Sequence, residues 1–461
     1  MQSITVKELL TAVCGTLLAG SEDTVISAVS TDSRTVKAGD LFIPIKGERF
    51  DGHDYIEKAL SAGAAGCLFS REPETKLPGK AYIKVDDPLL ALKRLGMYYR
   101  SRTNIPFVQI TGSVGKTTTK EMTAGMLKMQ YRTLKTEGNF NSDLGVPKTM
   151  LQLPGDYETA VIETGMDHFG EIRYLGEIVK PKIAVITNVG DVHAEFLGGT
   201  RMGVFRAKCE IFENLAADGC AVLNGDDELL NTVSLPQRIV RCGSGENCDV
   251  RILSVETHGI SGISCTIRTG RGDYALRIAA PGAHVAYSAA LAVAVGEELG
   301  MEHDAIAAGI EAFRSPDKRM AIETLVGDRV MIDDSYNANP QSMAAALRVL
   351  AAAETTRHIA FLGDMKELGD EIAASGHREI GRLIAELGID EVLCIGPLCR
   401  QYMVDAIESS GNTKVTWYSS REEAYPDLVK AFGEHTALLL KGSHFANRLD
   451  LAADYLRDYA F

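Results

Sequence analysis

The feature that most constrains the fold is a glycine-rich loop between an apolar strand and a helix. The strand is predicted over residues 106–110, the loop reads Thr111-Gly112-Ser113-Val114-Gly115-Lys116-Thr117-Thr118, and a helical stretch follows. Glycines let backbone N–H groups turn toward an anion, and the start of the helix adds free donors and a favourable dipole. The pattern predicts a phosphate site at the carboxyl end of a buried strand.

The side chains of this loop suggest their own roles. Lys116 would reach the β- and γ-phosphates of a nucleotide, and the Thr117 hydroxyl would ligate Mg²⁺. The loop is shorter than G-x-x-x-x-G-K-T, because only two residues separate Gly112 from Gly115, and this narrows the field to a subset of nucleotide-binding enzymes. The predicted nucleotide-binding residues here are Gly112, Ser113, Val114, Gly115, Lys116, Thr117 and Thr118.

Further short apolar runs alternate with helical stretches after the loop. They lie at residues 160–162, 183–186 and 220–223. Such runs predict a parallel sheet, in which the polar residues that follow each strand meet at one edge. Glu163 is then the natural partner of Thr117, because Mg²⁺ prefers hard oxygen ligands. His193, a few residues beyond the next strand, could ligate the metal or support its ligands.

Two residues are ambiguous from the pattern alone. Lys208 lies in a helical stretch, where a lysine usually covers apolar surface with its stem. Asn224 opens the segment Asn224-Gly225-Asp226-Asp227 after a strand. This segment could hydrogen-bond a nucleotide or cap the next helix, and the cap is favoured without further context.

The length of 461 residues predicts about three domains. Residues 1–100 mix short strands and helices. Residues 101–313 carry the phosphate loop in a mainly parallel sheet, with closely spaced β runs between residues 249 and 280 as an antiparallel appendage. Residues 314–461 form a second doubly wound α/β pattern. We therefore expect an α/β protein with an N-terminal α/β domain, a central phosphate-loop domain and a C-terminal Rossmann-like domain.

Composition excludes several functional classes. The 62 acidic and 48 basic residues leave a net charge of −14, which argues against non-specific electrostatic binding of nucleic acid or anionic lipid. No apolar run approaches the roughly 18 residues needed to span a bilayer, so membrane insertion is not expected. The nine cysteines are odd in number and form no C-x-x-C pair, which indicates a reducing, cytoplasmic setting.

Together these residues resemble the Mur ligase superfamily, and the resemblance extends through all three blocks. It rests on the loop 111–118, Glu163, Thr187-Asn188, His193, Asn224-x-Asp-Asp and Arg319. The resemblance implies an ATP-dependent amide-bond ligase whose first domain binds a uridine-diphosphate sugar.

Within the superfamily, the chain is similar to the branch that adds D-alanyl-D-alanine to UDP-N-acetylmuramoyl-tripeptide. The similar segments are residues 31–34, 39–42, 51–53, 137–141, 144–147, 333–340 and 362–369. The D-N-P-R motif of the common diaminopimelate-adding branch is absent, because Gln341 follows Asn339-Pro340. His444 stands where the branch more often has arginine, so no role is transferred to it. The resemblance implies substrate contacts at Ser33, Arg34, Lys46, Asn139 and Asn141.

The resemblance also implies a mechanism. ATP would phosphorylate the terminal carboxylate of the tripeptide, and the amine of D-alanyl-D-alanine would attack the acyl phosphate to give the UDP-N-acetylmuramoyl-pentapeptide precursor of peptidoglycan. Two Mg²⁺ ions would assist, and Lys208 matches the position of a carbamylated lysine that bridges to the second ion. The implied catalytic residues are Lys116, Lys208 and His193; the implied metal ligands are Thr117, Glu163, His193 and Lys208; the implied nucleotide contacts beyond the loop are Asn224, Arg319, Asn337 and Asn339.

Two alternatives remain open at this point. The chain could belong to another branch, such as the diaminopimelate-adding ligases or the folylpolyglutamate synthases, although the segment Thr31-Asp32-Ser33-Arg34 argues against the folate enzymes. It could also be a non-catalytic nucleotide sensor, although a degenerate site would be expected to lose at least one of Lys116, Thr117, Glu163 and Lys208. The sequence does not specify whether the third peptide residue is lysine or diaminopimelate, and the family makes a monomer the default.

Overall fold

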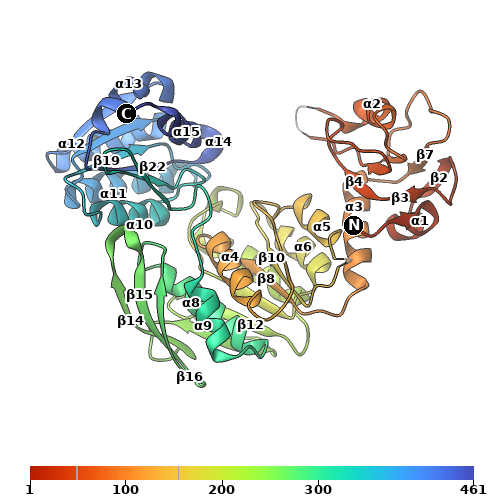
Figure 1. The fold of residues 1–461 in the computed structure, drawn as a ribbon, viewed down its shortest axis with the longest axis horizontal. Helices are drawn as coiled ribbons and strands as arrows, with labels where there is room; N and C mark the ends of the chain where they lie inside the picture. The colour runs from red at the N-terminus through yellow and green to blue at the C-terminus, as the bar shows by residue number, and fades with distance from the viewer. Residues whose placement is uncertain (48–49, 154) are drawn as a thin grey trace.

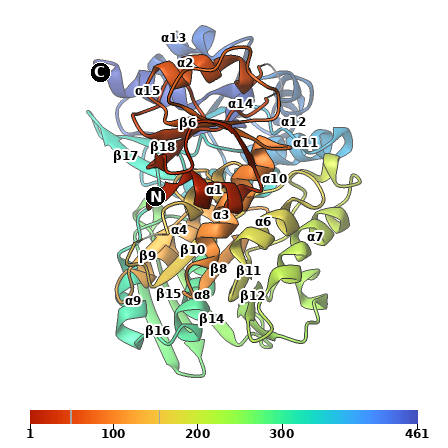
Figure 2. The same cartoon turned by 90° about the vertical axis from the view of Figure 1, so that its right-hand side faces the viewer.

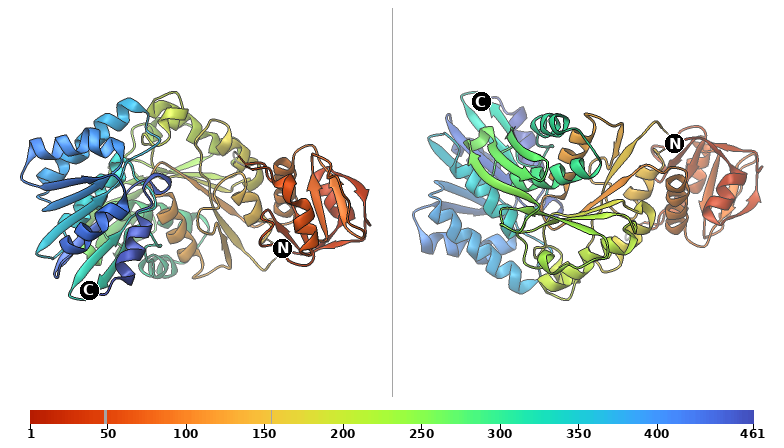
Figure 3. Two further views of the ribbon diagram at one scale, coloured as in Figure 1. Left: turned by 90° about the horizontal axis from the view of Figure 1, so that it is seen from above. Right: turned by 90° about the horizontal axis from the view of Figure 1, so that it is seen from below.

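The structure is a computed structural model that describes residues 1–47, 50–153 and 155–461. Three sheets form the cores of three domains, which lie in a row with the N-terminal domain at one end and the C-terminal domain at the other (Figures 1 and 3). The sheets are mainly parallel and flanked by helices, so the predicted three-domain α/β class is confirmed.

The N-terminal domain is built on a five-stranded sheet of order β2-β7-β6-β5-β4, in which β4 to β7 are parallel, with a separate β1–β3 pair. The first helix begins at a capping box, where the Thr5 side chain accepts from the Glu8 N–H and Glu8 reaches back to Thr5. The elements are β1 (Ile4–Thr5), α1 (Val6–Val13), β2 (Thr16–Ala19), β3 (Val25–Ile26), β4 (Ala28–Ser30), β5 (Asp40–Phe42), η1 (Gly52–Tyr55), α2 (Ile56–Ser61), β6 (Gly66–Phe69), β7 (Ala81–Lys84) and α3 (Pro88–Ser101).

The central domain contains a nine-stranded sheet of order β16-β15-β14-β13-β12-β11-β8-β10-β9. Strands β9 to β14 and β8 pair in parallel, and β14, β15 and β16 pair antiparallel, so the appendage continues the same sheet. The strands are β8 (Phe107–Thr111), β9 (Thr133–Lys135), β10 (Thr159–Glu163), β11 (Ile183–Ile186), β12 (Cys220–Asn224), β13 (Arg238–Gly243), β14 (Val250–Thr257), β15 (Ile263–Thr269) and β16 (Gly272–Ile278).

Helices cover both faces of this central sheet. Helix α8 packs on β12 to β15 and against α4, while α6 and α7 belong to the opposite layer. The α-helices are α4 (Lys116–Leu127), α5 (Gly145–Met150), α6 (Glu171–Val179), α7 (Arg201–Cys209), α8 (Val285–Glu298) and α9 (His303–Glu311).

The C-terminal domain has a six-stranded sheet of order β17-β18-β22-β19-β20-β21, parallel except for β17. Strands β17 and β21 were not anticipated from the sequence, because both lie at sheet edges and are only partly buried. The strands are β17 (Ala321–Leu325), β18 (Arg329–Asp333), β19 (Arg357–Leu362), β20 (Glu391–Ile395), β21 (Lys414–Tyr418) and β22 (Thr436–Lys441); the helices are α10 (Pro340–Ala351), α11 (Asp370–Glu386), α12 (Val404–Ser410), α13 (Arg421–Ala431), α14 (His444–Asn447) and α15 (Asp450–Asp458), with the π-helical turn η6 (Cys399–Met403) before α12.

Helix α3 joins the N-terminal domain to the central one by packing against α5 and α6 (Figures 1 and 2). Lys93 of α3 forms an ion pair with Glu177, and its ammonium lies 3.5 Å from the centre of the Tyr174 ring. In the described part of the chain, no helix is long and apolar enough to cross a bilayer.

Candidate active site

The phosphate loop connects β8 to α4 and is held in shape by the segment that follows β11. The backbone N–H of Val114 donates to Asn188 Oδ1 at 2.9 Å, and the Thr187 hydroxyl donates to the Val114 carbonyl at 2.6 Å. Gly112 has a φ of 154°, and a Cβ there would lie 1.9 Å from Thr187 Oγ1. This close approach explains why the position requires glycine.

Lys116 is the first residue of α4, and its ammonium lies over the loop. It donates to the Gly112 carbonyl at 2.7 Å and to the Ser113 carbonyl at 3.4 Å. Burial lowers the pKa of Lys116, with Glu163 opposing and Arg319 adding to that effect. The loop therefore presents a cation and N–H groups on the side where a nucleotide phosphate is expected.

Glu163 ends β10 and lies opposite Ile110 of β8 in the sheet register. Its Oε1 atom accepts from Asn141 Nδ2 at 2.8 Å and from the Thr117 hydroxyl at 3.3 Å. Its Oε2 atom is buried without a hydrogen-bond partner among the described residues. A buried carboxylate oxygen normally has a partner, so this free oxygen beside a threonine hydroxyl fits a divalent cation with oxygen ligands.

His193 contacts the C-terminal domain as well as the central one. It has a left-handed φ of 63°, and its backbone N–H donates to the Glu367 carbonyl at 3.0 Å. Its Nδ1 atom lies 3.0 Å from Glu367 Oε2 without hydrogen-bond geometry to it. The sequence did not predict this contact between His193 and Glu367, because no local pattern in the chain reports a contact between domains.

Lys208 lies in α7 and is only 2% exposed. The surface position that is usual for such a lysine is therefore wrong for this chain. Burial lowers its pKa well below the ordinary value of 10.5, and the neighbouring charge of Lys116 lowers it further. Lys208 forms no ion pair with a carboxylate of the described residues. An amine with a lowered pKa loses its proton more readily than the amine of an exposed lysine does.

A cavity of about 1500 Å³ extends from the phosphate loop to the C-terminal domain. Fourteen residues predicted from the sequence line it: Ser113, Val114, Gly115, Lys116, Thr117, Thr118, Asn139, Asn141, Glu163, His193, Asn224, Arg319, Asn337 and Asn339. Gly112, Ser33, Arg34, Lys46 and Lys208 do not line it. The structure thus brings together most of the residues predicted to bind the nucleotide. The predicted substrate residues of the N-terminal domain lie outside this cavity.

The C-terminal domain adds charged residues that the sequence reasoning missed. Lys441 ends β22, is 1% exposed, and donates to the Asn337 carbonyl at 2.8 Å and to Asp334 Oδ2 at 2.5 Å. Lys366 also lines the cavity, after the end of β19. Their position after strand ends was the available signal, because ligands of doubly wound sheets bind there.

Some predicted residues have additional structural roles. The side chain of Asn339 caps α10 by accepting from the Ser342 N–H at 2.9 Å. The Arg319 guanidinium lies 3.8 Å from the centre of the Tyr336 ring. The segment after β12 acts as a cap, since Asp227 accepts from the N–H groups of Leu229 and Leu230, while Asn224 still lines the cavity.

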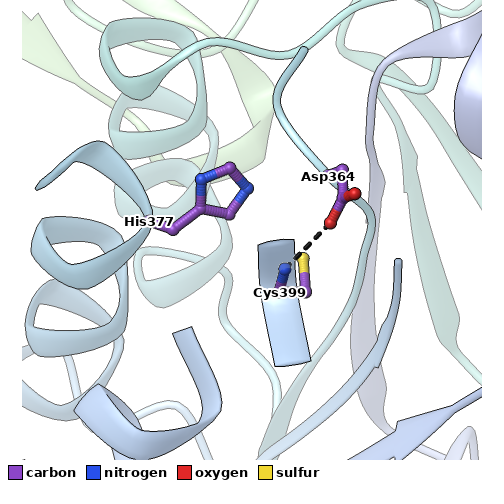
Figure 4. Close-up of side chains that lie close together, drawn as sticks. All are labelled: Asp364, His377 and Cys399. Atoms are coloured by element: carbon purple, nitrogen blue, oxygen red, sulfur yellow. Dashed lines mark hydrogen bonds between the residues drawn. The ribbon is translucent and has the colours of Figure 1, made fainter. Parts of the chain in front are cut away.

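Three buried side chains, Asp364, His377 and Cys399, lie close together (Figure 4), and Asp364 belongs to the loop that carries Lys366 and Glu367. The Cys399 N–H donates to Asp364 Oδ1 at 2.8 Å. His377 Nε2 accepts from the Met365 N–H at 3.1 Å, and Nδ1 lies 2.7 Å from the Ala373 carbonyl. Because both ring nitrogens are engaged, the histidine has no lone pair left for a metal, and the cluster anchors the loop.

Replacing His377 with leucine is expected to flatten the pH dependence of stability in the C-terminal domain. Burial lowers the pKa of His377 from 6.5, so the unfolded chain binds this proton at a higher pH than the folded chain. The wild-type free energy of unfolding should therefore fall as the pH drops below about 6.5, by up to ~1.4 kcal/mol per pH unit until the folded pKa is reached.

Fluorescence of Trp417, the single tryptophan of the chain, follows urea unfolding of this domain. The matched control is His435→Leu, because His435 is exposed. Equal slopes of stability against pH in wild type and His377→Leu would contradict the prediction.

The fold and the cavity define a three-domain nucleotide-binding protein in which a phosphate loop faces cations of a Rossmann-like domain. Residues 25–104 match the Mur ligase family catalytic domain, residues 110–296 the Mur ligase middle domain, and residues 318–444 the Mur ligase glutamate ligase domain. The chain belongs to the Mur ligase family.

Individual relatives narrow the likeness to one branch. The chain is 35% identical to the UDP-N-acetylmuramoyl-tripeptide–D-alanyl-D-alanine ligase of Bacillus subtilis over 98% of both chains. It superposes on a crystal structure of MurF from Acinetobacter baumannii with a TM-score of 0.89 and 32% identity, covering 99% of this chain and 100% of that one. MurF from Thermotoga maritima in complex with ADP gives a TM-score of 0.80 and 26% identity, covering 93% and 96%.

Proposed function

We propose that this chain is an ATP-dependent ligase that joins D-alanyl-D-alanine to UDP-N-acetylmuramoyl-tripeptide and releases ADP and phosphate. The observation that most directly supports this proposal is one continuous cavity, which joins the phosphate loop to the cations of the C-terminal domain. Relatives similar to this chain over nearly their whole length are named for this reaction. A nucleotide sensor would not need Lys366 and Lys441 in the same cavity as the phosphate loop.

The phosphate loop is proposed to bind the β- and γ-phosphates of ATP, with Lys116 following the γ-phosphoryl group as it transfers. Thr117 and Glu163 are proposed to hold Mg²⁺, which would neutralise charge on that group. The likeness to a relative in complex with ADP supports this nucleotide. Asn224, Arg319, Asn337 and Asn339 would contact the rest of the nucleotide, and His193 would complete the metal surroundings from the central domain.

The peptide carboxylate is activated by becoming an acyl phosphate. The free amine of D-alanyl-D-alanine then attacks the carbonyl carbon of this acyl phosphate. The amine loses a proton, and phosphate leaves as the amide forms. Developing negative charge in both steps lies where Lys116, Arg319 and Lys441 are gathered, and preorganised cations stabilise such charge most in a site that excludes water. Asn139 and Asn141 are proposed to orient the peptide, and Ser33, Arg34 and Lys46 the uridine-diphosphate sugar.

Lys208 is proposed to be carboxylated on its Nζ atom. A neutral amine adds CO₂ and releases a proton, which leaves an anionic carbamate. The lowered pKa of Lys208 and the lack of an ion pair to it among the described residues support this proposal. The carbamate would offer oxygen atoms to a second Mg²⁺ and balance the charge of Lys116.

We further propose that the protein acts as a monomer in the cytoplasm. Its nine cysteines are all free, which fits a reducing compartment. The domain boundaries after residues 100 and 313 stay predictions.

The function is tested by incubating the purified chain with ATP, Mg²⁺ and UDP-N-acetylmuramoyl-tripeptide, with and without D-alanyl-D-alanine. The expected result is ADP release and pentapeptide formation only when the dipeptide is present. Tripeptides ending in lysine and in diaminopimelate are assayed side by side. ATP consumption without a pentapeptide product in either series would overturn the proposal.

Oxygen label placed in the terminal carboxylate of the tripeptide is expected to appear in the phosphate product. The acyl phosphate passes one carboxylate oxygen to the leaving phosphate, so the label transfers once per amide formed. Mass spectrometry of the phosphate measures this transfer. Label that enters phosphate only from labelled water would indicate plain ATP hydrolysis.

A further inference from the structure

A lysine that the sequence did not single out lies where the N-terminal and central domains meet. Lys148, in the short helix α5, donates to the Thr31 hydroxyl of the N-terminal domain at 2.6 Å. Helix α5 follows the predicted peptide-binding residues Asn139 and Asn141, and Thr31 lies two residues before the predicted sugar-nucleotide residue Ser33. One side chain therefore connects the two segments proposed to bind the same substrate.

Thr31 stands at the ligand-binding edge of the N-terminal sheet. Strand β4 ends at Ser30 and pairs in parallel with β5, so the segment 31–34 follows a strand at its carboxyl end. Ligands of parallel α/β sheets bind at this edge. Lys46, beyond the end of β5, belongs to the same edge.

Of the two cations Arg34 and Lys148 near this edge, only Arg34 is paired with a carboxylate in the described part of the chain. The Arg34 guanidinium makes three hydrogen bonds to the carboxylate of Asp32, between 2.7 and 3.1 Å. Lys148 has no carboxylate within ion-pair distance among the described residues, and Thr31 Oγ1 is the one partner its ammonium has there. An ammonium has three donors, so two remain for a ligand, and the Thr31 hydroxyl keeps its own proton to donate.

Burial lowers the pKa of Lys148, and the nearby charge of Asp32 opposes that effect. A half-buried cation without a carboxylate partner is costly, and an anionic ligand would remove that cost. In a chain of net charge −14, an anion needs a local cation of this kind.

We propose that Lys148 is a substrate-binding residue whose ammonium, with the Thr31 hydroxyl, holds a phosphate group of the sugar-nucleotide substrate between the N-terminal and central domains. The identity of that substrate rests on the proposed function. Binding there ties the two domains together, because the donors come one from each.

The test compares Lys148→Met and Lys148→Gln with Lys58→Met. Lys58 is an exposed lysine near Asp32 that does not contact Thr31, so it is the matched control. Lys148→Met is expected to raise the KM for UDP-N-acetylmuramoyl-tripeptide about tenfold or more, the effect of losing a charge-assisted hydrogen bond. The kcat and the KM for ATP should stay within about twofold of wild type, as should every constant of Lys58→Met.

Competition with UDP and with uridine separates a phosphate contact from packing. Lys148→Met should weaken UDP binding about tenfold or more and leave uridine binding within about twofold. Equal weakening of UDP and uridine, or an unchanged KM for the sugar nucleotide, would overturn the proposal. Lys148→Gln keeps a donor for Thr31 without the charge, so it supplies the same comparison if Lys148→Met does not fold.

The two proposals fail in different ways. Wild-type protein that forms no pentapeptide, but binds UDP in a Lys148-dependent manner, overturns the proposed function and supports the phosphate contact. Wild-type protein that forms pentapeptide with no effect of Lys148→Met or Lys148→Gln on the sugar-nucleotide KM overturns the phosphate contact alone.

Discussion

Lys116→Ala is expected to abolish ligase activity, with a loss of about 10³-fold or more in kcat/KM. The Lys116 ammonium lies over the phosphate loop, 2.7 Å from the Gly112 carbonyl, where the proposed ATP site would place the phosphates. No other residue of the loop can replace a charge that moves with the γ-phosphoryl group. The measurement is pentapeptide formation at saturating ATP, together with nucleotide affinity by competition.

The fold should survive this substitution, because Lys116 contributes hydrogen bonds at a helix start and little apolar packing. Lys128→Ala is the matched control, since Lys128 is an exposed lysine at the opposite end of the same helix. Thermal unfolding of both variants should stay close to that of wild type. Turnover of Lys116→Ala within a few-fold of the control would refute the phosphate role.

Lys208→Ala is expected to lose most activity, about 10²-fold or more, because the carbamate that balances Lys116 and supplies metal ligands cannot form. Bicarbonate carrying a carbon label should give a carbamate signal in wild type that the variant lacks, and this readout does not depend on turnover. Acetate or formate in solution is expected to restore part of the activity of Lys208→Ala by offering a carboxylate in the vacated space.

Stability separates this role from simple packing. Methionine keeps the apolar stem of the buried Lys208 and removes a polar group that is costly to bury, so Lys208→Met should unfold no more easily than wild type while remaining as inactive as Lys208→Ala. Arg206→Ala serves as the control, because Arg206 is exposed on the same helix. Full activity in Lys208→Met would leave only a packing role for the stem of this lysine.

The sequence by itself determined the fold class, and it predicted most of the residues that line the cavity beside the phosphate loop. The strand, the glycine loop and the helix are contiguous in the chain. Their structure depends on local backbone preferences, which distant residues do not change. Glu163 could be placed beside Thr117 because parallel strands align their carboxyl ends. The antiparallel strands after residue 249 were equally readable, since alternating residues and glycine turns are local signals.

The edge strands β17 and β21 escaped detection for the opposite reason. Each packs on one side only, so its residues lack the continuous apolar run of a central strand. The capping role of Asn339 was also hidden, because a residue that follows a strand can serve a ligand, a helix or both.

Contacts between domains were decided by the tertiary structure alone. The His193 N–H donates to the Glu367 carbonyl and the Lys148 ammonium donates to the Thr31 hydroxyl, although the partners lie 174 and 117 positions apart in the chain. The same is true of Lys208, whose helical surroundings suggest an exposed side chain and whose burial arises from packing against the sheet. A sequence specifies local backbone preferences directly, whereas burial, pKa and the pairing of charges depend on which surfaces meet after folding.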